Sequence, residues 1–352
     1  MILNTGGRTD TVNYFSEWLL NRFREGYALS RNPFYHDVVN RIELTPETID
    51  VVEFCSKNYR PILPRLHEIT DRFNCHFHYT ITAYGKDIEP NVPCIDESIE
   101  TLKELSAQVG KEKIIWRYDP VLLTDKYTIE RHFETFDYMA ERIAPYVDRC
   151  LFSFVVWYKK LRMPELLPIS DQQKERIARG LGEIAANHHL YIQTCGTKES
   201  YEQYGIQSSG CMTRAVYEHS LGLHFKKLTE KGNRPGCKCM ESRGLGDYNT
   251  CINGCRYCYA NYDHEKAKEN YALHDPLSPL MIGHLKPMTR SSPCIKRASL
   301  TKNPDYSNQL SPPLCLLALL IIHIIHVHAM TDLILTVAIL GASITIHRRA
   351  RH

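Results

Sequence analysis

The sequence predicts an α/β protein whose core is a TIM-like barrel, full or partial, of six to eight βα units. Short apolar segments recur every 30 to 50 residues as far as residue 195, and amphipathic segments of helical period separate most of them. No Gly-x-Gly-x-x-Gly run follows any apolar segment, which argues against an open dinucleotide-binding sheet. A length of 352 residues is ample for one such domain.

The expected elements alternate along the first part of the chain. An insertion at residues 27–44 predicts a hairpin, because Arg31-Asn32-Pro33 favours a turn between two extended segments. Gly180 and Gly182 weaken the middle of the last helix. We expect strands at residues 2–5, 50–54, 76–82, 113–118, 150–157 and 190–194, and helices at residues 11–24, 61–73, 96–109, 128–144 and 171–187.

Charged side chains follow several of these strands, where barrel enzymes carry their chemistry. Arg8 and Asp10 follow the first strand, Lys57 follows the second, and Arg117 and Asp119 end the fourth. We predict that these five residues orient or activate a substrate at a largely cationic mouth, which suits a small molecule with carboxylate or phosphate groups. The alternative for each of them is an ordinary solvated loop charge.

Cysteines are the unusual component, since 13 are present and five of them fall between residues 237 and 258. The amino-terminal residues contain neither a basic start nor a long apolar run, so we expect no secretory signal and a cytoplasmic protein with reduced thiols. Reduced thiols at this density favour metal binding. The net charge of +3 is small and no basic stripe with interleaved aromatics occurs, so nucleic-acid binding is not expected.

The densest group reads Cys251-Ile252-Asn253-Gly254-Cys255-Arg256-Tyr257-Cys258. Spacings of three and two residues between the thiols let one compact loop bind a single face of an iron–sulfur cluster. Zinc sites more often use paired Cys-x-x-Cys units, so this spacing favours iron–sulfur over zinc. Tyr257 is placed to pack over the cluster or over an adenine ring.

Four further cysteines, Cys195, Cys211, Cys237 and Cys239, provide enough thiols for a second iron–sulfur cluster or a zinc ion. The alternative is that Cys195 and Cys211 are small buried residues. We expect the others before residue 200 to be packed in the core: Cys55, Cys75, Cys94 and Cys150. His76 and His78 alternate on one face of the third strand and either line the barrel or are satisfied core histidines.

The chain divides by composition into four parts. We expect residues 1–195 to supply the βα units and residues 196–290 to add a cysteine-rich iron–sulfur segment to the same domain, folded onto the barrel mouth. A C-terminal extension at residues 291–312 precedes an apolar tail at residues 313–352. Because histidines and Asp332 interrupt the tail, it is either a C-terminal membrane anchor or a segment outside the fold.

The Cys-x-x-x-Cys-x-aromatic-Cys pattern resembles the signature of radical S-adenosylmethionine enzymes. That resemblance implies a [4Fe–4S] cluster on Cys251, Cys255 and Cys258, with Tyr257 as the aromatic residue of the motif. It also implies S-adenosylmethionine on the fourth iron, an electron donor such as flavodoxin or ferredoxin, and a βα barrel. In most members the cysteine loop follows the first strand, whereas here the first-strand loop Thr5-Gly6-Gly7-Arg8-Thr9-Asp10 has no cysteine.

A second resemblance covers the chain to about residue 312. Its motifs are Gly7-Arg8-Thr9-Asp10, Ser16-Glu17-Trp18, Arg31-Asn32-Pro33, the run from Tyr84 to Pro90, Trp116-Arg117-Tyr118-Asp119-Pro120 and the stretch from Cys251 to Ala260. In this order they are similar to an uncharacterised bacterial family, domain of unknown function 1848, which has a C-terminal cysteine cluster. The family implies no substrate. A non-catalytic iron–sulfur or zinc protein with a binding or regulatory role, and a hydrolase using Asp10 or Asp119 as base, therefore stay as alternatives.

Overall fold

The structure, a computed structural model, describes residues 1–32, 35, 38–158, 161–225, 231–232 and 237–285, and the backbone of residues 290–294. The chain divides into two compact units, Met1–Leu300 and Thr301–His352. The expected tail at residues 313–352 and most of the expected extension lie outside the described residues. Within the described part, no helix has the length and apolar character needed to cross a membrane.

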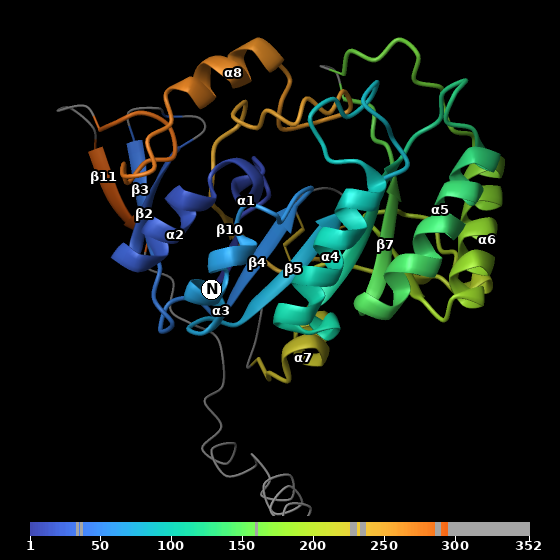
Figure 1. Ribbon diagram of the computed structural model, residues 1–352, viewed down its shortest axis with the longest axis horizontal. Helices are drawn as coiled ribbons and strands as arrows, with labels where there is room; N and C mark the ends of the chain where they lie inside the picture. Colours follow the sequence, from blue (N-terminus) through green and yellow to red (C-terminus); the bar gives the residue numbers. More distant parts are fainter. Residues whose placement is uncertain are drawn as a thin grey trace, which may run out of the picture. The chain divides into compact units, whose positions relative to one another are not determined.

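An eight-stranded sheet forms the centre of the first unit, and every strand pairs in parallel with its neighbours (Figure 1). All six strands expected from the sequence are present, and the α/β class with a parallel sheet is confirmed. The strand order is β10-β1-β4-β5-β6-β7-β8-β9, and the strands span β1 (Ile2–Asn4), β4 (Val51–Ser56), β5 (Cys75–Thr80), β6 (Ile114–Val121), β7 (Arg149–Phe154), β8 (Tyr191–Cys195), β9 (Gln207–Ser209) and β10 (Ser242–Gly244).

The strands β9 and β10 stand at the two edges of this sheet, and among the described residues no strand pairing joins them. Two other contacts bridge this gap. The Met240 amide donates to the Met212 carbonyl at 2.9 Å, and a Cβ built on Gly210 would lie 3.1 Å from the Cys239 nitrogen. The segment that follows β9 therefore runs beside the segment that precedes β10. We call this contact region, residues 210–212 and 238–240, the seam.

Three helices, α4 (Ile95–Val109), α5 (Ile129–Ile143) and α6 (Asp171–Asn187), cover one face of the sheet, as predicted. Their apolar residues and the outward-facing strand residues, such as Phe77 and Trp116, form the main hydrophobic core. Thr128 and Ser170 cap α5 and α6 by accepting hydrogen bonds from backbone amides in the first turn.

The glycines of α6 have a packing role that sequence reasoning missed. A Cβ at Gly180 would lie 2.3 Å from the Phe133 ring, and one at Gly182 would lie 2.3 Å from the Tyr204 carbonyl oxygen. The glycines lower the helical propensity of α6, but they also let it approach α5 and the turn at residues 202–204 closely.

Two predicted helices differ from the structure. The helix expected at 11–24 is broken into α1 (Thr11–Tyr14) and α2 (Ser16–Glu25), because Phe15 leaves helical geometry and its ring packs on Tyr271 and His274. The helix expected at 61–73 is reduced to a 3-10 turn (Leu63–Arg65) and the short α3 (His67–Thr70), consistent with the prolines at positions 61 and 64.

The predicted hairpin insertion is confirmed. Strands β2 (Tyr27–Arg31) and β3 (Val38–Glu43) pair in antiparallel fashion, and β11 (Arg290–Cys294) adds to β3 to make a separate small sheet. Helix α8 (His264–Ala272) lies at the same end of the molecule as the carboxyl ends of the central strands (Figure 1).

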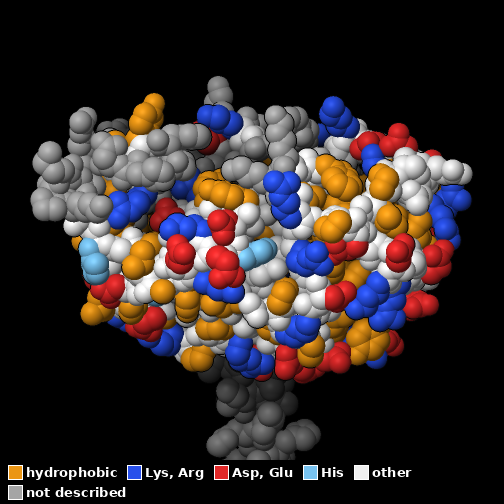
Figure 2. All heavy atoms as spheres, turned by 90° about the horizontal axis from the view of Figure 1, so that it is seen from above, with side chains coloured by type: hydrophobic (Ala, Val, Ile, Leu, Met, Phe, Trp, Pro, Cys, Tyr) orange, Lys and Arg blue, Asp and Glu red, His pale blue; other side chains and the backbone are white. Residues whose placement is uncertain are grey.

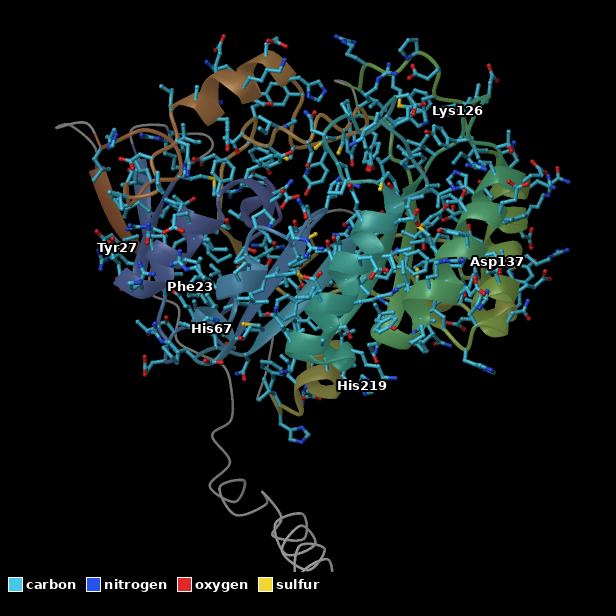
Figure 3. The ribbon with its side chains drawn as sticks, viewed as in Figure 1. Phe23, Tyr27, His67, Lys126, Asp137 and His219 are labelled. Carbon is cyan, nitrogen blue, oxygen red and sulfur yellow. The ribbon has the colours of Figure 1, made fainter. Side chains whose placement is uncertain are left out.

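The second face of the sheet is inward-facing and partly polar. Its apolar residues, such as Ile115 and Leu151, pack with helix α7 (Arg214–Leu221) and residues around it. Helix α7, which carries the labelled His219, lies at the amino-terminal end of the strands, opposite the end where α8 lies (Figures 1 and 3). Buried polar side chains of β4, β5 and β8 face this interior, and the candidate sites lie there and at the carboxyl ends of the strands.

Candidate functional site

The cysteine motif loop, residues 251–258, folds back onto the carboxyl ends of the strands. Its Asn253 carbonyl accepts from the Asn91 amide at 3.1 Å, and its Arg256 amide donates to the Ile88 carbonyl at 3.1 Å. These two contacts dock the motif loop against the loop that follows β5. The Tyr259 hydroxyl, just beyond the motif, donates to the Gly7 carbonyl at 2.7 Å. The loop thus reaches the cysteine-free loop of the first strand from a distant part of the sequence.

Asp10 fastens the motif loop to β1 and β4. Its buried carboxylate accepts hydrogen bonds from the Ser56 hydroxyl at 2.6 Å, from the Lys57 amide at 3.0 Å and from the Asn253 side-chain amide at 3.0 Å. It also caps α1 by accepting from the Asn13 amide. Burial raises the pKa of Asp10, although the four hydrogen bonds oppose this by favouring the charged form. The geometry makes Asp10 an anchor of the motif loop.

Lys57 lies beside the motif as well. Its ammonium is 2.8 Å from a carboxylate oxygen of Glu89 and 5.8 Å from the centre of the Tyr257 ring, and the Tyr257 hydroxyl donates to the same carboxylate. Burial alone would lower the pKa of Lys57, but the charge of Glu89 outweighs it, so the pKa is raised and the ammonium stays charged. Glu89 was not a predicted site residue; its only signal was its place in the Tyr84–Pro90 motif.

The three motif thiols are enclosed but separated. Cys251 and Cys255 are buried and Cys258 is half-buried, and burial raises the pKa of all three thiols. Among the described residues, the sulfur atoms of these three cysteines do not all lie within 4.8 Å of one another. A single tetrahedral ion would hold thiolates about 3.8 Å apart. The wider separation fits a multi-iron cluster, in which each thiolate binds a different iron.

A cavity of about 600 Å³ adjoins the motif. Its lining includes Cys258 and the cationic side chains of Arg162 and Arg256, and Arg256 pairs with Glu165. Arg8, one of the predicted strand-end residues, lies against the ring of Tyr248 from the same lining at 5.6 Å. Aromatic rings make up much of the remaining wall: Tyr158, Tyr248, Tyr259 and Tyr262.

The second predicted cysteine group comes together at the seam. The sulfur atoms of Cys195, Cys211 and Cys239 lie within 4.8 Å of one another, with 3.4 Å between those of Cys211 and Cys239. Cys237 interacts with Cys195 and Cys239 through side-chain hydrogen bonds. Hydrogen bonds from the neighbouring thiols lower the pKa of Cys195. We call these residues the four-thiol group. Three of them, Cys195, Cys211 and Cys239, have a spacing compatible with one tetrahedral ion and could hold a metal, and Cys237 adjoins them.

Arg117 and Asp119 lie on the inner face of β6. The Arg117 guanidinium donates to Asp119 and, at 3.2 Å, to the Cys55 sulfur. Asp119 also accepts from the Ser153 hydroxyl. The charge of Arg117 interacts with Cys195 and Cys211 as well, so this cation faces the four-thiol group.

A third group lies deeper in the interior: Glu53, His76 and His78 have ligand atoms within 4.8 Å of one another and could also hold a metal. Sequence reasoning named the two histidines but missed Glu53 and its partner Tyr217. A carboxylate inside the apolar run Val51-Val52-Glu53-Phe54 was the available signal. Burial lowers the pKa of His78 to about 4, so its imidazole is neutral at neutral pH.

The four cysteines expected to be core residues differ from one another in burial and surroundings. Cys75 and Cys150 are buried against the helical layer, as expected. Cys55 instead faces the interior beside Arg117, and Cys94 is exposed at the amino terminus of α4, so the expectation of core packing is wrong for Cys94. All the described cysteines lack disulfide bonds.

Charges of both signs are interspersed over the face shown in Figure 2, with hydrophobic side chains scattered among them.

In comparisons with known proteins, a family model described as a domain of unknown function (DUF1848) matches residues 2–260. No curated protein matches the chain.

Proposed function

Because this chain belongs to the DUF1848 family, whose name assigns no activity, we propose its function from the candidate site. We propose that the protein binds an iron–sulfur cluster and acts as a radical S-adenosylmethionine-like enzyme on a small substrate. The observation that carries the proposal is the placement of the motif loop. Three enclosed thiols lie at the carboxyl ends of parallel strands, beside a cavity of about 600 Å³. Active sites of parallel α/β folds lie at this end.

The donor set suits a [4Fe–4S] cluster on Cys251, Cys255 and Cys258, because three thiols on one short loop leave one iron for another ligand. When bound, such a cluster with S-adenosylmethionine would supply a 5′-deoxyadenosyl radical that takes hydrogen from the substrate. The ammonium of Lys57 interacts with the Cys255 thiol and would offset the negative charge of the thiolates. Asp10 and Asn253 hold the loop in place.

The cavity lining supports a substrate with an anionic group and a flat apolar part. Arg162 offers a cation, and tyrosine rings offer stacking surfaces. Arg8, Arg117 and Asp119 lie outside this lining, so we assign them to the support of the site and of the four-thiol group. An electron donor such as a flavodoxin or ferredoxin belongs to the same proposal.

The test is anaerobic reconstitution of the full chain with iron and sulfide, followed by EPR of the reduced protein with and without S-adenosylmethionine. The expected result is about four irons per chain in the motif, a cluster signal altered by S-adenosylmethionine, and release of 5′-deoxyadenosine. The variant Cys255→Ser is expected to lose the signal, while Cys150→Ser, which removes a buried thiol from the helical layer, retains it.

Three other outcomes separate the alternatives. A chain that takes up no iron contradicts the proposal outright. A cluster that neither responds to S-adenosylmethionine nor yields 5′-deoxyadenosine indicates the non-catalytic iron–sulfur protein. Zinc in place of iron at Cys251, Cys255 and Cys258 indicates a structural metal. That result favours the alternative of a hydrolase with Asp10 or Asp119 as base.

We assign a separate ion, zinc or a single iron, to the four-thiol group. This assignment rests on the 3.4 Å separation of the Cys211 and Cys239 sulfurs, which is close to the thiolate spacing around one tetrahedral ion. The expected result at the zinc edge of the purified full chain is a sulfur-ligated component that the variant Cys211→Ser removes.

A further inference from the structure

Glu53, His76 and His78 form a cluster that the proposed function does not use. They lie on neighbouring strands: Glu53 of β4 is directly opposite His76 of β5, and His78 is two residues farther along β5. The two-residue period of a strand places both imidazoles on the same face. That face is the interior one, and each of the three side chains is almost fully buried, with exposures of 0%, 0% and 2%.

The distances within the cluster match those between ligands of one metal ion. The Nδ1 atom of His76 is 2.9 Å from one carboxylate oxygen of Glu53, and the Nε2 atom of His78 is 3.5 Å from the other. Nitrogen and oxygen ligands at about 2.1 Å from an ion lie about 3.0 Å apart when they occupy adjacent octahedral positions, and somewhat farther apart in a tetrahedron. The cluster therefore needs little rearrangement to enclose an ion.

Polar atoms without hydrogen-bond partners in the cluster point to a missing ligand. The Oε1 atom of Glu53, the Nε2 atom of His76 and the Nε2 atom of His78 are buried, and none of them has a hydrogen-bond partner. Buried polar atoms are normally satisfied, so an unsatisfied atom calls for an explanation such as an ion. Two of these atoms, Oε1 of Glu53 and Nε2 of His78, lie 3.5 Å apart, and an ion between them would satisfy both. The ion would bind His76 through Nδ1, the atom that faces Glu53, and not through Nε2.

The surroundings suit a cation. The Tyr217 hydroxyl of α7 donates to Glu53 at 2.8 Å, and its ring stands edge-on to His76 with 5.3 Å between the ring centres, so α7 holds both side chains in orientation. Arg117 is the cation that faces His78, and its guanidinium is paired with Asp119.

We propose that Glu53, His76 and His78 bind one divalent first-row transition-metal ion, such as Zn²⁺ or Fe²⁺, in the interior of the fold. Two imidazoles and one carboxylate form a ligand set that these ions accept, whereas Mg²⁺ and Ca²⁺ prefer oxygen ligands. This ion is independent of the cysteine motif, and it differs from the ion of the four-thiol group in having nitrogen and oxygen ligands.

The test uses the full chain, stripped of metal with a chelator and then loaded with Zn²⁺ alone. The expected result is that His78→Asn and Glu53→Gln each bind about one Zn²⁺ fewer per chain than the parent. Zinc-edge X-ray absorption of the parent shows nitrogen or oxygen ligands together with sulfur, and the variants lose the nitrogen and oxygen component. His132→Gln is the matched control, because it removes a buried imidazole that bonds to Tyr118 and Leu122 and has no part in the cluster; it retains the ion.

The proposal fails if either folded variant binds as much zinc as the parent, or if the parent shows sulfur ligands only. The second measurement needs no variant, so it decides the matter even when both substitutions prevent folding. Failure here is also distinct from failure of the proposed function, since Cys255→Ser removes the motif cluster and is expected to leave the nitrogen- and oxygen-ligated Zn²⁺ in place.

Discussion

Asp10 illustrates at the scale of one residue how a charge at a strand end becomes part of the framework around a site. All four of its hydrogen-bond partners are donors: the Asn13 and Lys57 amides, the Ser56 hydroxyl and the Asn253 side chain. A carboxylate can accept all four, since it has about four lone-pair positions and no proton to place. The ionised form is therefore the one that this set of partners requires.

Replacement of Asp10 by Asn is expected to destabilise the protein by about 1–3 kcal/mol, because the new amide group turns its own hydrogens toward two of those donors. Since one of the donors is Asn253, the motif loop should also loosen, and its thiols should react faster with an alkylating reagent. Urea unfolding and the rate of thiol alkylation measure the two effects. Asp125→Asn, at an exposed turn position, is the control and should change stability by less than about 0.5 kcal/mol. An unchanged alkylation rate in Asp10→Asn would contradict the anchoring role.

Site residues were predicted where the local sequence pattern identifies them, and were missed where their role depends on contacts with distant parts of the chain. Asp10 and Lys57 were placed at strand ends from hydrophobic pattern alone, and both lie beside the motif loop. Glu89 and Tyr217 were missed, because their importance comes from contacts with residues 168 and 164 positions away in the chain. Pattern reasoning identifies which residues face an end or an interior, but pairing across such distances is a property of the folded chain.

At the scale of elements, helix α5 packs a histidine into the core. His132 is 1% exposed, its Nδ1 atom is 2.6 Å from the Tyr118 hydroxyl, and its Nε2 atom is 2.8 Å from the Leu122 carbonyl. Burial lowers the pKa of His132 to about 4, although the bond to the Leu122 carbonyl opposes the shift. The unfolded chain, with an ordinary imidazole pKa near 6.5, binds a proton at a higher pH than the folded chain does.

This difference predicts an acid-sensitive stability. Because the folded pKa is the lower one, the contribution of His132 is fully present above pH about 6.5 and is lost as the pH falls toward 4. Between pH 7 and pH 5 the free energy of unfolding should fall by about 2 kcal/mol from this residue. Urea unfolding at both pH values should show a smaller loss in His132→Gln. Tyr118→Phe keeps the imidazole buried, so its free energy of unfolding should fall between pH 7 and pH 5 as much as that of the parent. An equal fall in the parent and in His132→Gln would refute the assignment.

The elements themselves were well predicted where hydrophobic period and caps agreed, as in α4, α5 and α6. The first helix was expected to be continuous, because Val12, Phe15, Trp18 and Leu19 have helical spacing. The structure breaks it at Phe15, whose ring packs against Tyr271 of α8 and His274 just after that helix. Tertiary packing thus overrides the local pattern, and the sequence of the segment alone does not predict the break in the helix.

At the scale of the whole fold, the parallel sheet has a seam between its edge strands, and the four-thiol group lies across that seam. Cys195 ends β8, Cys211 follows β9, and Cys237 and Cys239 precede β10. A metal ion on these thiols would therefore join the two edges of the sheet that backbone pairing leaves apart. In this view the ion takes the place of the strand pairing that closes a complete barrel. The sequence predicted the four thiols as a group, but it contained no sign that they would lie between the two edge strands β9 and β10.

Loss of this ion is expected to open the seam while leaving the helical layer intact. The variant Cys211→Ser should lose one metal ion per chain and should exchange backbone hydrogen faster in β9 and β10, because each of these short edge strands pairs with only one neighbour and would lose the ion that joins them. Exchange in β5 and β6, which are covered by α4 and α5, should change little. Hydrogen exchange followed by mass spectrometry measures both regions at once. Cys75→Ser is the matched control, since it removes a buried thiol that donates to the Phe73 carbonyl and has no part in the four-thiol group; it should retain the metal and the slow exchange at the seam. Faster exchange spread evenly over the whole sheet would show instead that the ion supports the fold generally and not the junction of its edges.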